Sequence, residues 1–165
     1  MKKMLLISGI ASLAISAQAQ NTKLFAFSAV EKGTPQWSSI HQLNASTGAD
    51  EALVPDIRLQ ATIKSSLPNN TYLHGVAAAL AFDEATQQLF YTTMHGNAIH
   101  AYNVVQKTVQ SFYPPTFSSG GTAGQEGNVV TRMCAASNGL IYTLTNDGNS
   151  LCSFSPNNPS KITQH

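Results

Sequence analysis

Apolar and turn-forming positions recur along the chain with a spacing of 52 residues. Residues 80–108, shifted by 52 positions, fall on residues 132–160 without a gap. The matched positions include Leu89 with Ile141, Phe90 with Tyr142, Gly96 with Gly148 and Asn97 with Asn149. Because turn residues and their apolar neighbours recur together, the pattern indicates a structural repeat.

Each full copy of the repeat predicts a four-stranded antiparallel meander. Polar turns such as Asp83–Thr86 and Asp147–Asn149 separate short apolar runs, and Gly and Asn provide the positive φ that tight hairpins need. The strands expected in the central copy are Val76–Phe82, Gln88–Met94, Ala98–Val105 and Thr108–Tyr113.

A partial copy precedes these two. Lys23–Phe27 resembles Gln88–Thr92, and Ser39–Asn44 resembles Ala98–Asn103. The connection between its two strands is longer, and length variation is typical of loops. The segment Ile57–Ile63 is a candidate for the outer strand of this first copy.

The apolar runs distinguish between β architectures. Leu89-Phe90-Tyr91 and Leu140-Ile141-Tyr142 do not alternate with polar residues, so both faces of these strands are expected to be buried, as in stacked propeller blades. Ala77–Ala81 offers the small side chains that an innermost strand needs near the axis. An Ala-rich helix over Val76–Ala85 is the alternative, and the repeat correspondence favours a strand.

The predicted fold is therefore all-β, a partial propeller of about three four-stranded blades at approximately 23–60, 76–113 and 129–165. The first copy lacks an innermost strand. We therefore expect the N-terminal part of a longer propeller, whose far end would supply that strand.

The N-terminus has the features of an export signal. Lys2 and Lys3 precede the short apolar run Met4–Ile15, and Ala17-Gln18-Ala19 is a small-x-small cleavage site. Residues 1–19 are therefore predicted to be a signal peptide, with export to the periplasm or outside the cell and no membrane attachment after cleavage. The net charge is +1 and charged residues make up only 10% of the sequence. The sequence therefore does not predict a basic surface of the kind that binds nucleic acid.

The motif Thr145–Asn149, preceded by Val130–Met133, is similar to an uncharacterised group of secreted bacterial propeller-like proteins. Ala79–Thr93 more loosely resembles blades of NHL-type and related six-bladed propellers. The resemblance implies the fold for most of the chain after residue 22. The same architecture carries ligand binding, protein binding and lactone hydrolysis, and no catalytic motif is matched, so no catalytic residue is predicted.

Three residues are candidates for ligand binding. His74 precedes an innermost strand and could face the central channel, Asp83 ends such a strand, and Trp37 lies beside a connection. For each, a structural role in a turn or under a loop is the alternative. Tyr72, Tyr113 and Phe117 lie in or beside connections as well, and burial is favoured for them too.

For the histidines and cysteines, structural roles compete with a metal site and a disulfide. His41 and His100 occupy one repeat position, which Cys152 takes in the third copy, and packing within separate strands is favoured over a metal site. Cys134 and Cys152 fall on the first and third strands of one blade, too far apart for a disulfide. Two unpaired and largely buried thiols are predicted.

These observations favour a non-enzymatic exported module that binds a protein or glycan through its loop-bearing face, with no cofactor. The alternative is a calcium-dependent, lactonase-like hydrolase, in which carboxylates near the channel would hold the ion. Asp83, Glu84 and Asp147 are the acids considered for that role.

Overall fold

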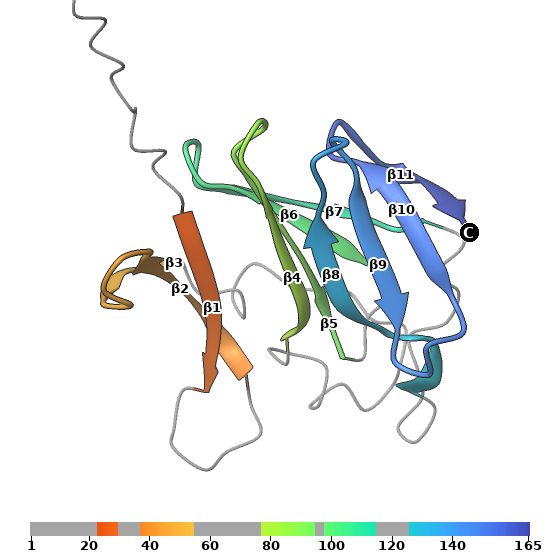
Figure 1. Ribbon diagram of the computed structural model, residues 1–165, viewed down its shortest axis with the longest axis horizontal. Coiled ribbons are helices and arrows are strands. Elements are labelled where there is room, and N and C mark those ends of the chain that lie inside the picture. The colour runs from red at the N-terminus through yellow and green to blue at the C-terminus, as the bar shows by residue number, and fades with distance from the viewer. Residues whose placement is uncertain (1–22, 30–36, 55–76, 95–97, 115–125) are drawn as a thin grey trace, which may run out of the picture.

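The computed structural model describes residues 23–29, 37–54, 77–94, 98–114 and 126–165 (Figure 1). Within these ranges the regular elements are strands and one short 3₁₀ helix, η2 (Glu126–Asn128). The strands form three separate antiparallel sheets. In each sheet, strands that follow one another in the sequence also lie side by side. The fold is all-β and consists of blade-like meanders, as predicted. None of the described helices has the length and hydrophobicity needed to cross a membrane.

The first sheet has the strand order β1-β2-β3. Its strands are β1 (Lys23–Ala29), β2 (Trp37–Asn44) and β3 (Asp50–Val54). The sequence placed β1 and β2 closely but missed β3, which pairs with β2 from Ile40 to Leu43. The candidate outer strand Ile57–Ile63 lies outside the described residues, as do residues 1–22 with the predicted signal peptide.

The middle sheet has the order β4-β5-β6-β7. Its strands are β4 (Ala77–Asp83), β5 (Gln88–Thr93), β6 (Ile99–Asn103) and β7 (Thr108–Phe112). Each of the four expected strands of the central copy is present. The Ala-rich segment is a strand rather than a helix, because pairing with β5 and packing between sheets outweigh its local helix propensity.

The third sheet has the order β8-β9-β10-β11. Its strands are β8 (Val130–Ala135), β9 (Ile141–Thr145), β10 (Leu151–Ser155) and β11 (Asn158–Gln164). Strand β10 lies 52 positions after β6 along its whole length, and β9 ends 52 positions after β5.

The middle sheet lies between the other two and is covered on both faces. Towards the third sheet it contributes Phe90, whose ring meets that of Phe154 edge-on at 5.3 Å between centroids. Towards the first sheet it contributes Leu89 and Tyr91, which pack with Ile40. Consecutive residues of β5 therefore enter two different cores, which explains why the strand shows no polar alternation.

The first strands of the middle and third sheets lie side by side, as Figure 1 shows for β4 and β8. Ala79 and Ala81 of β4 are buried in the core shared by these sheets. Small side chains let the two strands approach closely, as expected for innermost strands. A hydrogen bond from Thr92 Oγ1 to the Val130 carbonyl (2.7 Å) also joins the two sheets.

The strands present two kinds of end. At one, called the turn end, short turns 83–88, 103–108 and 135–141 join neighbouring strands. At the other, called the connection end, the chain leaves β1, β3, β5 and β7 and enters β2, β4, β6 and β8 (Figure 1). The connection end carries the longer segments of the sequence, and it corresponds to the loop-bearing face expected for ligand binding.

Candidate functional site

Two aromatic residues lie at strand ends of the connection end. Trp37 is the first residue of β2, and its Cα lies opposite that of Ala29. Tyr113 directly follows β7 and is 55% exposed. The expectation that Tyr113 is buried under a connection is therefore wrong, because the side chain extends beyond the last paired residue, Phe112, into solvent. An exposed tyrosine offers an apolar ring and a hydroxyl to a ligand.

A polar turn between β9 and β10 contributes the third sheet's part of the connection end. Asp147 accepts hydrogen bonds from Thr145 Oγ1 (2.6 Å) and from the backbone and side-chain nitrogens of Asn149 (3.0 Å each). The adjacent Gly148 has φ of +75°, a conformation that glycine adopts without strain. The turn is thus closed by its own side chains.

The same turn is tied to the segment that enters β8. Asn146 donates its backbone N–H to the Val129 carbonyl (2.8 Å), and Asp147 donates to Gly127 (3.1 Å). Arg132 Nη1 donates to the Thr145 carbonyl (3.2 Å). These hydrogen bonds fix the β9–β10 turn to the segment that enters the neighbouring strand β8, which gives this part of the connection end a defined polar shape.

The hydrogen bonds to Asp147 also affect its charge. Donation from Thr145 and then from the Asn149 backbone holds the pKa of the Asp147 carboxyl below its ordinary value. The side chain is exposed, so the turn presents a carboxylate to solvent. Such a group can accept hydrogen bonds from hydroxyl or amide donors of a ligand.

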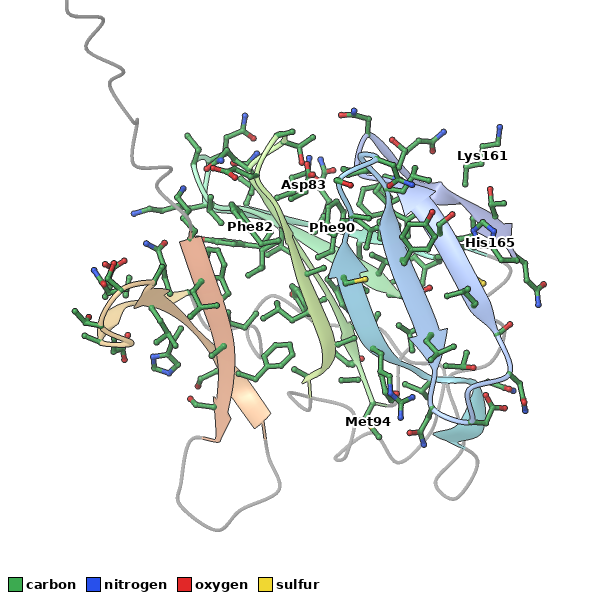
Figure 2. All side chains as sticks on the ribbon, in the orientation of Figure 1. Phe82, Asp83, Phe90, Met94, Lys161 and His165 are labelled. Atoms are coloured by element: carbon green, nitrogen blue, oxygen red, sulfur yellow. The ribbon has the colours of Figure 1, made fainter. Side chains whose placement is uncertain are left out.

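The predicted ligand-binding residues are not gathered in one place. Asp83 ends β4 at the turn end, where its Oδ2 accepts from Thr86 N (2.8 Å) and Thr86 Oγ1 (2.5 Å). Figure 2 shows Asp83 at the opposite end of the sheet from Met94. Trp37 begins its strand at the connection end, and His74 lies outside the described residues. The structure therefore does not bring Asp83 and Trp37 together.

A buried polar group lies on the face of the middle sheet that is turned towards the first sheet. His100 stacks on Tyr91 at 4.8 Å between ring centroids, and its Nδ1 contacts Ser111 Oγ at 2.8 Å. Burial lowers the pKa of His100 to about 4, so its ring is neutral at pH 7. Burial likewise raises the pKa of Tyr91.

His41 occupies the equivalent position in the first sheet but has a different environment. Its Nδ1 lies 2.7 Å from Oδ2 of Asp50 on the neighbouring strand β3, and both side chains are accessible to solvent. His41 and His100 therefore lie in separate sheets with separate partners. Their placement on separate sheets is as predicted, and His100 is packed in the sheet interior, whereas His41 is accessible to solvent.

The structure pairs a hydroxyl and an imidazole that the sequence did not suggest. Ser153 Oγ of β10 lies 2.8 Å from Nε2 of His165, whose ring is tilted against that of Tyr142. Both residues fall in the blade expected at approximately 129–165, but the sequence alone does not show which positions of its strands lie next to each other.

The two cysteines lie on opposite sides of β9. Cys134 is opposite Tyr142 and Cys152 is opposite Thr143, so two strand spacings separate them, and both thiols are free in the structure. Cys152 is buried, and burial raises the pKa of its thiol. Cys134 is exposed, contrary to the prediction of burial, because it lies on the face of the third sheet turned away from the middle sheet.

A metal site would need at least three convergent ligands. In the part of the chain that the structure describes, no group of three His, Cys, Asp or Glu side chains is close enough to hold an ion.

No protein-family model matches the sequence, and no curated protein matches it either. Several solved structures align with the chain. Virginiamycin B lyase from Staphylococcus aureus is 15% identical with a TM-score of 0.47, and the alignment covers 79% of this chain and 35% of the lyase. A second, titled as a streptogramin B lyase structure, is 14% identical with a TM-score of 0.47, and the alignment covers 78% of this chain and 33% of the lyase. The hemopexin fold protein CP4 from cow pea is 12% identical with a TM-score of 0.49, and the alignment covers 87% of this chain and 60% of CP4. This chain therefore spans about a third of the length of the lyases.

Proposed function

We propose that this chain is an exported propeller-type module that binds a glycan or protein ligand at its connection end. Two observations carry the proposal: the exposed Tyr113 follows β7 of the middle sheet and the hydrogen-bonded turn around Asp147 follows β9 of the third sheet, both strands ending at the connection end. Rigid sheets hold both groups, and sites on connections of a rigid scaffold are typical of binding proteins.

A glycan suits the chemistry of this end best. Sugars present an apolar face that stacks on an aromatic ring and hydroxyls that donate to carboxylates and amides. Tyr113 offers the ring, and the exposed side chains of Asn146, Asp147 and Asn149 offer polar atoms. The low charge of the whole sequence is consistent with a neutral ligand.

Isothermal titration calorimetry provides a direct measurement. Titration with a panel of neutral soluble oligosaccharides should give saturable heats of binding for at least one of them. Tyr113→Ala and Asp147→Ala should each weaken that binding by about tenfold, the effect of one lost contact.

The matched control is Val105→Ala. Val105 is exposed as well, at 69%, but belongs to the turn between β6 and β7 at the turn end. Its substitution should leave the titration unchanged. Binding that survives both connection-end substitutions and is lost in the Val105 variant would place the ligand elsewhere, and a panel without any saturable response would contradict a neutral glycan.

Export is tested separately. If residues 1–19 are removed during export, protein recovered from the periplasm or medium of an expressing bacterium should begin at Gln20. Intact-mass measurement identifies that N-terminus. Recovery of the chain in the cytoplasm with Met1 or Lys2 still present would contradict the proposal.

A further inference from the structure

The first sheet has one strand fewer than the other two. The middle and third sheets have four strands each and begin with β4 and β8, whereas the first sheet has three, in the order β1-β2-β3. Lys23–Phe27 of β1 corresponds in the repeat to Gln88–Thr92 of β5, which is the second strand of its sheet. Within the described ranges, no strand takes the place of β4 or β8 in the first sheet, and β1 has one edge without a paired strand.

Strand β4 is covered unequally on its two faces. Ala79 and Ala81, which face the third sheet, are buried next to β8. Leu80 and Phe82, which face the first sheet, are only half-buried. Figure 1 shows β4 between β1 and β8, and β4 lies alongside β8 but approaches β1 at few positions. The side of β4 that faces β1 therefore has apolar surface that the described strands cover only in part.

The free edge of β1 has the regular geometry that strand addition needs. Its pairing with β2 is in register from Lys23 to Ser28 and shifts only between Ser28 and Ala29. The edge strands β4 and β8, in contrast, have register irregularities near their first residues. A straight edge presents its N–H and C=O groups in the line that a new antiparallel strand requires.

The innermost strand of the middle sheet shows which side chains such a strand needs. Ala81 of β4 lies opposite Phe90 of β5, and Ala79 lies opposite Thr92. Both alanines are buried against the third sheet, where the larger Met133 of β8 packs on the same core. Small side chains at alternate positions thus let the innermost strand approach the next sheet closely.

The same argument applies to β1 through the repeat. Phe25 and Phe27 take the places of the β5 residues that lie opposite the two alanines, and both pack on the core shared with the middle sheet. The ring of Phe25 lies 4.9 Å from that of Phe82. A strand added to β1 places the residues opposite Phe25 and Phe27 on the face towards β4, where they meet Leu80 and Phe82. Small residues are therefore expected at these two positions of the added strand.

We propose that the free edge of β1 binds an extended segment of a partner protein, which adds a fourth strand to the first sheet. The segment pairs with Lys23–Ser28 through its backbone and presents Gly, Ala or Ser at alternate positions towards β4. Backbone hydrogen bonds supply affinity in this mode of recognition, and the small side chains supply specificity. The site runs along β1 rather than at the connection end, so this inference does not rest on the proposed glycan site.

A peptide with the β4 sequence Ala77–Asp83 is the probe, because it carries the required pattern of small residues. Fluorescence anisotropy of the labelled peptide, titrated with the purified protein, should show saturable binding. A peptide with Ala79→Leu and Ala81→Leu should bind at least about tenfold more weakly, because the larger side chains do not fit against β4. The matched control peptide carries Leu80→Thr, on its opposite face, and should bind almost as well as the original.

Hydrogen–deuterium exchange locates the bound peptide. Saturating peptide should slow the exchange of backbone amides in β1 and leave the edge strands β3, β7 and β11 unchanged, since a newly formed ladder protects the amides that take part in it. Protection of one of those other strands in place of β1 overturns the proposal.

A substitution in the protein tests the contribution of β4. Leu80→Gln should weaken peptide binding by about tenfold, because it replaces apolar surface that the peptide covers. Val105→Gln is the control, since Val105 is 69% exposed in the turn between β6 and β7 and should not affect binding. Circular dichroism melting confirms that both variants are folded.

Two further results contradict the proposal, and neither depends on a protein variant. Absence of saturable binding to the unsubstituted protein would mean that the β1 edge is not free, for example because another segment of the same chain pairs with it. Equal binding of the original peptide and the peptide with two leucines would mean that the bound segment does not pack against β4.

Discussion

The middle and third sheets contain similar apolar runs in different surroundings. In β5, Leu89 through Thr93 are all buried, while in β9 buried Ile141, Thr143 and Thr145 alternate with half-buried Tyr142 and Leu144. The middle sheet packs on both faces and the third sheet on one, within the described part of the chain. A continuous apolar run therefore indicates that a strand can be covered on both faces, and its neighbours determine whether it is.

The difference extends to buried polar groups. At equivalent positions, the middle sheet buries the imidazole of His100 and the third sheet buries the thiol of Cys152. The imidazole makes a hydrogen bond with Ser111 and its pKa is lowered to about 4, whereas the pKa of the thiol is raised. Acid should therefore protonate His100 on unfolding, whereas the Cys152 thiol stays protonated in acid and should contribute nothing to such a response.

Truncation of the shared core should have the largest effect. Phe90→Ala removes a fully buried ring (Figure 2). This ring meets that of Phe154 between the middle and third sheets, so its removal should reduce the free energy of unfolding by about 3–5 kcal/mol. Tyr142→Ala, on the face of the third sheet turned away from the middle sheet, is the control and should cost much less. Urea unfolding measures both, and equal losses would mean that the two faces of the third sheet are packed alike.

Acid should destabilise the protein through His100. Its folded pKa of about 4 is below the ordinary value of 6.5, so between these values the unfolded chain binds a proton that the folded chain does not. Stability is therefore complete above about pH 6.5 and falls as the pH is lowered towards 4, by up to about 3 kcal/mol. Urea midpoints at several pH values measure the loss.

The control for this pH effect is His100→Cys, which places the third sheet's residue in the middle sheet. The variant lacks the histidine contribution, so its stability should depend less on pH between 4 and 6.5 than that of the unsubstituted protein. Parallel pH profiles for the two proteins would show that another group is responsible.

A smaller effect is expected at one turn residue. Gln87 and Gly139 are 52 positions apart, end equivalent turns at the turn end, and have φ of 55° and 76°. Replacing Gly139 by Gln should lower the free energy of unfolding by about 1 kcal/mol, because residues other than glycine are strained at positive φ. No atom lies within 4 Å of the added Cβ, so no new contact offsets this strain. An unchanged urea midpoint would contradict this view of the turn.

Strand positions could be predicted from the sequence wherever the repeat was strong. Strands β5 and β10 carry the aligned apolar residues and turn signals, and the Ala-rich β4 was placed by its correspondence with β8 despite its helix propensity. Strand β3 was missed because Asp50 and Glu51 begin it with two acids, and edge strands tolerate charge that a buried strand does not.

The exposure of single side chains was harder to predict. Cys134 and Tyr113 were expected to be buried on the basis of residue type, but burial depends on which face another sheet covers. Asp83 and Trp37 were separate ligand-binding candidates, one at the end of an innermost strand and the other beside a connection. The end of β4 lies at the turn end and the start of β2 at the connection end, so the two backbone positions are not close.

Both β4 and β8 have a register irregularity near their first residues, between Ala77 and Ala79 in one and between Val130 and Arg132 in the other. These strands lie side by side, each at the edge of its own sheet, where two straight edges could join into one continuous ladder. A bulge bends and twists an edge, so that its amide and carbonyl groups no longer align with those of a neighbour. The paired bulges thus protect the molecule against merging of its own sheets and against fibril formation through the same edges.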